Sequence, residues 1–498
     1  MNDHLILPWL EISIGVPLLG AIVLAGRRNP VVARNWALIF AGLSLLSAIG
    51  AWQNFTVLHA RSAAVHHVDE PGGWMTKVFG RELLEVDDLS APLLPLVALL
   101  YFLTTAATLR TKIRRVSFSL TLAAEAISMA TFCCKEREHW LLIVLLAAGC
   151  IPPYLELRAR GKPTRVYVLH MAAFLMLLAG GWSFLETEGR THTLAALIPL
   201  MLAVFIRSGI APFHCWMTDL FEHAGFGTSL LFVTPLVGAY LAIRLLLPVA
   251  PDWVLRSVAL VSLITAVYAA GMALVQREAR RFFCYLFISH SALVLVGLEM
   301  VTPIGLTGAL CLWLSIGLSL GGFGLTIRSL EARSGRLLLS DYHGLYDHTP
   351  THAVCFLLTG LASVGFPGTA GFIGTELLVD GAVHLYPYIG FAVVIAAALN
   401  GIAVVHAYFI LFTGTRHSST VSLQIGNRER LAVFALAALI LAGGIFPQWG
   451  VQQRHDAAEF LLKERAAVIG EPPPESPPCG ALARSRALVR FIPSGRRL

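Results

Sequence analysis

The chain has 498 residues, of which 56% are hydrophobic and only 13% are charged. Soluble domains are roughly one-quarter charged, so this composition excludes an ordinary soluble enzyme and predicts a membrane protein. The formal net charge of +7 does not require a nucleic-acid partner, because basic loops beside a membrane account for most of it.

Apolar segments recur along the whole chain, and each is long enough to cross a bilayer, which takes roughly 17–25 residues. About fourteen can be counted, with approximate centres at Pro17, Leu43, Leu99, Ile127, Leu146, Leu175, Leu202, Pro235, Thr265, Leu293, Gly317, Gly365, Ala397 and Leu439. The prediction is an all-α, polytopic membrane protein of about 14 transmembrane helices that is embedded in the lipid bilayer. A soluble repeat of buried helices is the less favoured alternative.

The charges of the loops predict the orientation of the chain in a cell (inner) membrane. The odd-numbered loops are the basic ones, and they hold Arg27, Arg28 and Arg34, then Arg110, Lys112, Arg114 and Arg115, then Arg158, Arg160, Lys162 and Arg165, then Arg277, Arg280 and Arg281, then Arg328, Arg333 and Arg336, then Arg416, Arg428 and Arg430. Basic loops stay on the cytoplasmic side, so the N-terminus is expected outside. It lacks the basic start of a cleaved signal peptide.

The polar stretches predict how the chain is divided. The second loop, roughly Gln53–Asp88, is polar and is expected outside. After Phe446 we expect a short amphipathic helix at Ala457–Ala467, a stiff Pro-rich linker at Glu471–Pro478 and a basic tail at Ser485–Leu498. With fourteen spans this basic tail lies outside, against the usual bias. The expected divisions are 1–115, a first five-helix repeat at 116–250, a second at 251–415, a last span at 416–450 and a tail at 451–498.

No cofactor or metal site is predicted. The eight cysteines are scattered, and their spacing suggests neither zinc binding nor a disulfide framework. The chain has no CxxC cluster, no GxGxxG after a strand and no haem ligands on facing helices. Any oxidoreductase activity would therefore belong to an assembly that contains this chain.

Two apolar segments carry helix breaks. The seventh has Arg207 inside an apolar run and is interrupted at Pro212, and the twelfth is interrupted at Gly365–Gly371. An arginine at bilayer depth is costly and rarely idle, and the freed backbone groups of a broken helix need protein or a water-lined cavity. The breaks are five segments apart. Because a unit with an odd number of helices begins and ends on opposite sides of the membrane, two consecutive five-helix units of like fold would have opposite orientations. Paired breaks in inverted halves point to a transport site.

Four stretches resemble a known family. They are Ala211–Asp219 followed by Glu222, Ala273–Tyr285 with Ile288–His290, Gly365–Gly374, and Asp87–Ser90. Together they resemble the antiporter-like, proton-translocating membrane subunits of respiratory complex I. That family also includes subunits of multisubunit cation/proton antiporters, of membrane-bound hydrogenases and of a two-component inorganic-carbon transporter. The resemblance covers roughly Asp87–Gly444 and implies a fourteen-helix fold with inverted five-helix repeats.

The resemblance implies a proton path that this chain has altered. Ala147 stands where the family has a glutamate, and Arg207 and Leu236 stand where it has lysines. Ile316 and Thr375 replace its titratable groups in the eleventh and twelfth helices. A buried lysine can release its proton, whereas arginine effectively cannot. The first half-channel therefore lacks the glutamate and lysine side chains that take up and release the proton in the family.

Titratable candidates remain along both halves, and the expected ion path comprises Arg207, His290, Glu376, Asp380, His406, Glu222 and Glu125. His290 matches the family histidine, and histidine is a natural proton carrier near neutral pH. Arg207 is expected to gate the path, to pair with Glu222 or Glu125, or to attract an anion. Its alternative role is a structural counter-ion, and the other candidates have packing or surface roles as alternatives.

Three functions remain open. The first is an ion-translocating subunit that moves protons, or sodium, together with other membrane subunits. The second is the membrane subunit of an inorganic-carbon uptake complex whose soluble partner performs zinc chemistry. The third is a non-pumping scaffold that anchors a catalytic subunit.

Overall fold

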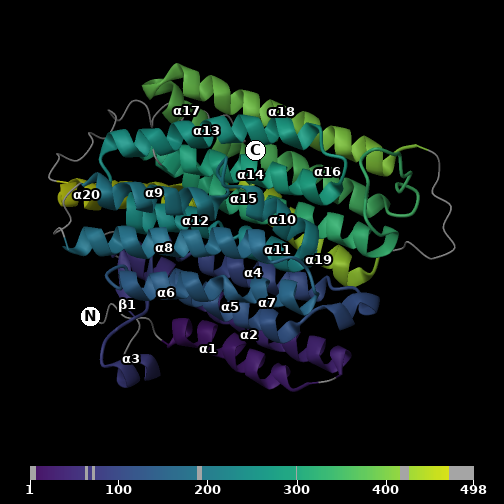
Figure 1. Ribbon diagram of the computed structural model, residues 1–498, viewed down its shortest axis with the longest axis horizontal. Coiled ribbons are helices and arrows are strands. Elements are labelled where there is room, and N and C mark those ends of the chain that lie inside the picture. Colours follow the sequence, from purple (N-terminus) through teal and green to yellow (C-terminus); the bar gives the residue numbers. More distant parts are fainter. Residues whose placement is uncertain are drawn as a thin grey trace, which may run out of the picture.

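The computed structural model describes residues 7–27, 29–61, 65–69, 73–187, 193–298, 300–414 and 425–469. The expected linker Glu471–Pro478 and the basic tail Ser485–Leu498 lie outside these residues. The described chain is almost entirely helical. Figure 1 shows the helices side by side, from α1 at one edge of the bundle to α18 at the other, with α19 and α20 returning between them.

The first part of the chain forms helices and one short hairpin. Its elements are α1 (Trp9–Ala25), α2 (Pro30–Arg61), β1 (His67–Asp69), α3 (Trp74–Phe79), β2 (Glu85–Asp87), α4 (Leu93–Ala106), the 3-10 turn η1 (Arg110–Arg115), α5 (Phe118–Cys133), α6 (His139–Gly149) and α7 (Ile151–Ala159). The strands β1 and β2 pair antiparallel, with Val68 opposite Val86. The loop expected from Gln53 begins later, because α2 continues to Arg61 and buries Phe55.

The middle of the chain holds several short helices. Its elements are α8 (Arg165–Thr187), α9 (Leu194–Ser208), α10 (Cys215–His223), α11 (Phe226–Val233), α12 (Val237–Leu241), the π-helical turn η2 (Ala242–Leu246), α13 (Asp252–Leu274) and α14 (Ala279–Leu298). A break that the sequence analysis did not mark separates α11 from α12. Pro235 supplies no backbone N–H there, and Leu236 has a φ of 53°.

The last part contains the longest buried helix. Its elements are α15 (Pro303–Ser334), α16 (Pro350–Val364), α17 (Ala370–Leu385), α18 (Pro387–Phe412), α19 (Asn427–Ile445) and α20 (Pro447–Ile469). The helix α15 packs against α4, α14, α16, α17, α19 and α20. A Cβ at Gly308 would come within 2.5 Å of the Leu378 backbone nitrogen, so only glycine allows α15 and α17 to approach so closely. The helix expected at Ala457–Ala467 is confirmed within α20.

The described helices make this a multi-pass membrane protein. Eight of them are long and apolar enough to cross a bilayer, and further apolar helices of 10–17 residues accompany them. Large apolar side chains lie exposed on the outer helices, among them Leu169 and Met176 at 69% and Phe391 at 68%. Such surfaces suit lipid rather than water. The count of fourteen spans and the inverted repeats stay predictions.

Candidate functional site

The expected break in the seventh segment is present, and protein groups satisfy its backbone. The helix α9 ends at Ser208, and α10 begins at Cys215. The Trp216 indole donates a hydrogen bond of 2.7 Å to the Ile206 carbonyl, and the Ala211 N–H donates to the Thr265 hydroxyl at 3.2 Å. These bonds replace those that a continuous helix would make, so the break is stable inside the bundle.

Arg207 lies at the end of α9, and its side chain is buried. Its Nη2 donates to the Phe232 carbonyl at 3.3 Å, and its guanidinium carbon lies 4.2 Å from the centre of the Phe232 ring and 5.9 Å from that of Trp216. Within the described part of the chain it forms no ion pair with an acid. Arg207 is therefore a positive charge held by a carbonyl and by aromatic faces.

The two expected partners of Arg207 are occupied or placed elsewhere. The Glu222 carboxylate accepts a hydrogen bond from Arg281 at 2.5 Å, near the end of the bundle. Glu125 lies on α5 and is fully buried, with the Ser44 side chain as a polar neighbour of its carboxylate. The Tyr101 and Ser128 hydroxyls are hydrogen-bonded to each other at 3.2 Å, and both residues line the same cavity as Arg207. They supply hydroxyl groups in the part of the bundle that holds Arg207.

Three adjoining cavities lead from one end of the bundle to Arg207. The outer cavity offers about 180 Å³ to a water-sized sphere, the central one about 50 Å³ and the inner one about 10 Å³. One water needs roughly 10–15 Å³ by this measure, so the first two can hold several waters. Glu156 and Thr228 line both the outer and central cavities, and Arg207 lines both the central and inner cavities.

The mouth of this series is strongly charged. Lining the outer cavity are Lys112, Arg115, Arg160, Arg280, Arg328, Glu156, Glu331 and Glu429. These basic residues come from the odd-numbered loops and the adjoining helix ends. The cavities therefore open at the end of the bundle where the chain concentrates its positive charge.

Glu156 marks the narrowing between the outer and central cavities. Its carboxylate accepts hydrogen bonds from the Gly225 N–H at 3.0 Å and from the Thr228 hydroxyl, and it pairs with Arg160 at 2.7 Å. It links α7 to the start of α11. The sequence analysis missed Glu156. This glutamate lies close to the basic loop that follows the segment, so the sequence suggests a charge at the end of a helix and not a group in the interior.

His290 lies beside the second break. It is on α14 and is 1% exposed, and its Nδ1 lies 2.7 Å from the Leu286 carbonyl. The backbone of Ser363, one residue before the end of α16, is close to its ring. The neighbouring Ser289 hydroxyl accepts a hydrogen bond from the buried Asn400 amide at 2.8 Å. A titratable ring and a buried polar pair thus occupy the interior next to the break.

The remaining candidates lie on the outside of the chain. Glu376 and Asp380 are one turn apart on α17, and His406 is on α18; all three are exposed. The break before α17 is present, with Gly365 at a φ of 91°, but these three side chains do not line the bundle interior. Lipid or another subunit would face them.

A buried ion pair near the first half also escaped the sequence analysis. Arg244 Nη2 lies 2.7 Å from Asp87 Oδ2, and the two side chains are 4% and 5% exposed. Burial alone would raise the pKa of Asp87, but the Arg244 guanidinium and hydrogen bonds from Ser90 lower it below its ordinary value. The cost of an arginine inside an apolar run, which singled out Arg207, would have identified Arg244 as well.

A bundle of apolar helices with buried charges beside its breaks defines a polytopic membrane protein with a polar interior. Residues 166–400 match the transmembrane family described as NADH:quinone oxidoreductase/Mrp antiporter. The resemblance expected from the motifs is thereby confirmed: over these residues the chain is similar to antiporter-like membrane subunits.

Relatives show the same resemblance, and solved structures share the fold. The chain is 28% identical to NADH-quinone oxidoreductase subunit 13 of Thermus thermophilus, over 89% of this chain and 96% of the relative. It is 27% identical to an NAD(P)H-quinone oxidoreductase chain 4 of Synechococcus elongatus, over 89% and 90%. A chain of respiratory complex I from Thermus thermophilus superimposes with a TM-score of 0.79 at 22% identity, over 92% of this chain and 99% of the other. A chain of the Mrp complex from Dietzia sp. gives 0.75 at 18% identity, over 93% and 99%.

Proposed function

We propose that this chain is a proton-translocating membrane subunit of an NADH:quinone oxidoreductase-type complex. The observation that carries the proposal is the set of buried charged or titratable groups inside the bundle, namely Arg207 and His290 beside the helix breaks and Glu125 on α5. Such groups are costly inside a membrane bundle and mark ion pathways. The named relatives are subunits of quinone oxidoreductases, which agrees with this role.

The entry part of the proposed path follows the cavities. Protons would arrive through water at the basic mouth and pass Glu156, whose carboxylate can exchange a proton with that water. Arg207 does not carry a proton. As a fixed cation it repels excess protons and so raises an electrostatic barrier to their passage. A change in the charge of a neighbouring group would change the height of that barrier. Glu125 is the buried acid of this half that could change charge.

The second part of the proposed path runs through His290. An imidazole can take up a proton on one nitrogen while it releases another. Ser289 and Asn400 supply hydrogen-bonding groups beside it. Glu376, Asp380 and His406 would then belong to a contact with lipid or a neighbouring subunit.

Several finer predictions belong to this proposal. They are the fourteen transmembrane helices, the inverted repeats at 116–250 and 251–415, the outside N-terminus, and protons rather than sodium as the ion. The basic mouth would lie on the cytoplasmic side, as positive loops do. Neither the uptake-complex hypothesis nor the scaffold hypothesis gains support from a specific contact.

The test measures NADH-driven acidification of inverted membrane vesicles with a pH-sensitive dye. We expect the variants Glu156→Gln and His290→Gln to lower the initial rate by at least about tenfold, because each removes a proton-exchanging group. His343→Gln, a change in the connection between α15 and α16, is the matched control and should keep the normal rate. Rates that stay normal in both path variants, with normal amounts of assembled complex, would contradict the proposal.

A further inference from the structure

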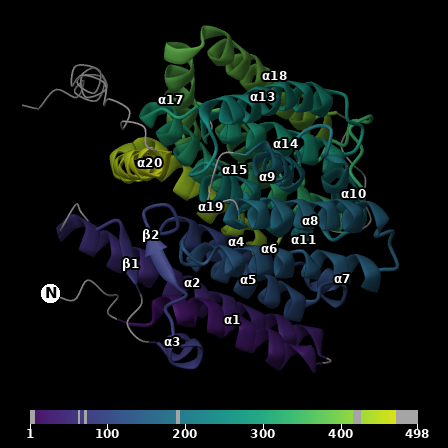
Figure 2. The same cartoon turned by 60° about the vertical axis from the view of Figure 1, so that its left-hand side comes forward.

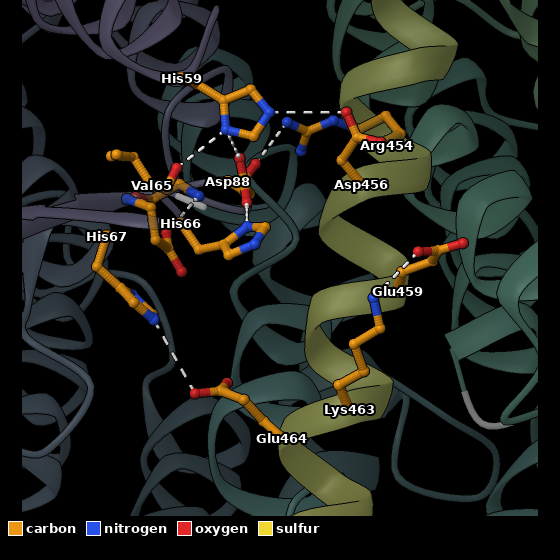
Figure 3. Close-up of polar contacts among 12 residues, drawn as sticks. His59, Val65, His66, His67, Asp88, Arg454, Asp456, Glu459, Lys463 and Glu464 are labelled. Carbon is orange, nitrogen blue, oxygen red and sulfur yellow. Dashed lines mark hydrogen bonds and ion pairs between the residues drawn. The ribbon is translucent and has the colours of Figure 1, made fainter. Parts of the chain in front are cut away.

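A cluster of histidines and carboxylates joins three parts of the chain away from the proposed ion path. His59 lies in the last turn of α2, His66 precedes β1, Asp88 follows β2, and Asp456 lies on α20 (Figure 3). Figure 2 shows that the hairpin and α20 lie at the same end of the molecule. The side chain of Asp88 is only 6% exposed, and those of His59 and His66 are 17% and 26% exposed.

Both nitrogens of His59 face oxygen atoms. Its Nδ1 lies 2.9 Å from the Val65 carbonyl and 3.6 Å from Asp88 Oδ1, and its Nε2 lies 3.7 Å from Asp456 Oδ2. A neutral imidazole has a single N–H and can satisfy an acceptor on one side only. A metal ion on one nitrogen would let the other nitrogen keep the N–H that faces the opposite oxygen atoms.

His66 completes the cluster on the other side of Asp88. Its Nδ1 lies 2.7 Å from Asp88 Oδ2, and its ring stacks on Phe460 of α20 with centres 4.4 Å apart. One ligand atom from each of His59, His66 and Asp88 falls within 4.8 Å of the others.

We propose that His59 Nδ1, His66 and Asp88 bind a divalent metal ion of the zinc type. Two imidazoles and a carboxylate are ligands that Zn²⁺ prefers, at about 2.0–2.2 Å. In that state His59 Nε2 carries the N–H and directs it toward the Asp456 carboxylate. A carboxylate behind a metal-bound histidine fixes the tautomer and the ring orientation.

The bound metal would tie the C-terminal helix α20 to the hairpin and to α2. Arg454 is the nearby cation, and its guanidinium points at the backbone carbonyls of Asp88 and Leu89, with the former at 2.5 Å. It therefore holds the ligand loop in place and leaves the Asp88 carboxylate to the metal. The site is structural, because it links elements and belongs to none of the cavities on the ion path.

The experiment uses the full chain, purified in detergent and stripped with a chelator. Zn²⁺ is titrated in competition with a chromophoric chelator, and retained zinc is measured by elemental analysis after gel filtration. We expect about one equivalent per chain, with affinity lowered at least about 100-fold in His66→Gln and Asp88→Asn, and about 10–100-fold in Asp456→Asn. His455→Gln is the matched control, because His455 is next to Asp456 but contacts Thr307 and Glu459.

Thermal unfolding of each variant, with and without Zn²⁺, distinguishes the loss of a metal ligand from poor folding. Zn²⁺ should raise the unfolding midpoint of the natural chain and of His455→Gln, and should leave those of His66→Gln and Asp88→Asn unchanged. Absence of retained zinc in the natural chain would overturn the proposal. Equal zinc affinity in all variants would overturn it too, since binding would then be at other histidines.

Discussion

The two long helix breaks of this molecule differ in where they place charge. Beside the first break, Arg207 is buried and lines two internal cavities. After the second break, Glu376 and Asp380 lie exposed on the outer side of α17. The titratable group in the interior of the second half is instead His290, on α14. Its ring lies close to the backbone of Ser363, just before the break.

This difference shows that a charge beside a broken helix does not by itself identify a path. A broken helix frees backbone groups, but the helical position of each side chain decides whether it faces the interior or the outside. On α17, positions 376 and 380 share the outer face, while Leu378 is fully buried against α15. The first half therefore offers an internal route for water, and the second offers a buried histidine and an acidic outer face.

The largest effect is expected at the ion pair of Arg244 and Asp87, because both charges are buried. Removal of one partner, in Asp87→Asn or Arg244→Met, leaves the other buried and unpaired, which costs about 3–5 kcal/mol of unfolding free energy. Asp87→Asn combined with Arg244→Met should recover much of that loss. The measurement is chemical unfolding in detergent. Equal stability of single and double variants would show that the pair is not coupled.

Arg207 should behave differently from Arg244, since it has no acid to leave behind. Arg207→Met is expected to change the unfolding free energy by less than about 2 kcal/mol, the worth of its desolvated contacts with aromatic rings. In the vesicle assay it should alter the acidification rate by at least about tenfold, the effect of a barrier change near 1.4 kcal/mol.

The control for Arg207 is Arg256→Met, because Arg256 is an exposed arginine whose side chain is 60% accessible. It should leave both stability and acidification unchanged. A stability loss in Arg207→Met as large as that in Arg244→Met, with normal acidification, would reduce Arg207 to a structural role. The contrast between the two halves would then rest on His290 alone.

Much of the fold followed from the sequence, because the bilayer imposes long apolar segments and costly interior charges. The breaks at Pro212 and Gly365 were predicted from residues that cannot continue a helix. The break before Leu236 was not, since the surrounding run is apolar and Pro235 alone is often tolerated as a kink in a membrane helix. The family resemblance rested on motif residues whose spacing is visible without any structure.

The site was harder to predict, because the face of a helix on which a side chain lies depends on its neighbours. His290 and Glu376 look equivalent in the sequence, as polar residues in apolar helices, but one is buried and the other exposed. Glu156 and the cluster of His59, His66 and Asp88 depend on contacts between distant segments. No local pattern brings α20 against the hairpin, so spacing could not reveal that cluster.

The smallest effect is expected at the acidic face of α17. Because Glu376 is exposed, Glu376→Gln should change the unfolding free energy of the isolated chain by less than about 0.5 kcal/mol. The acidification rate should change by less than about threefold, since a group outside the interior route alters the barrier by under about 1 kcal/mol. Both the vesicle assay and detergent unfolding can be run on the same preparation. A rate loss equal to that of His290→Gln, with the assembly intact, would mean that protons do reach this face. The two halves would then both use acids beside their breaks, and a neighbouring subunit would have to enclose Glu376 to keep lipid away from the path.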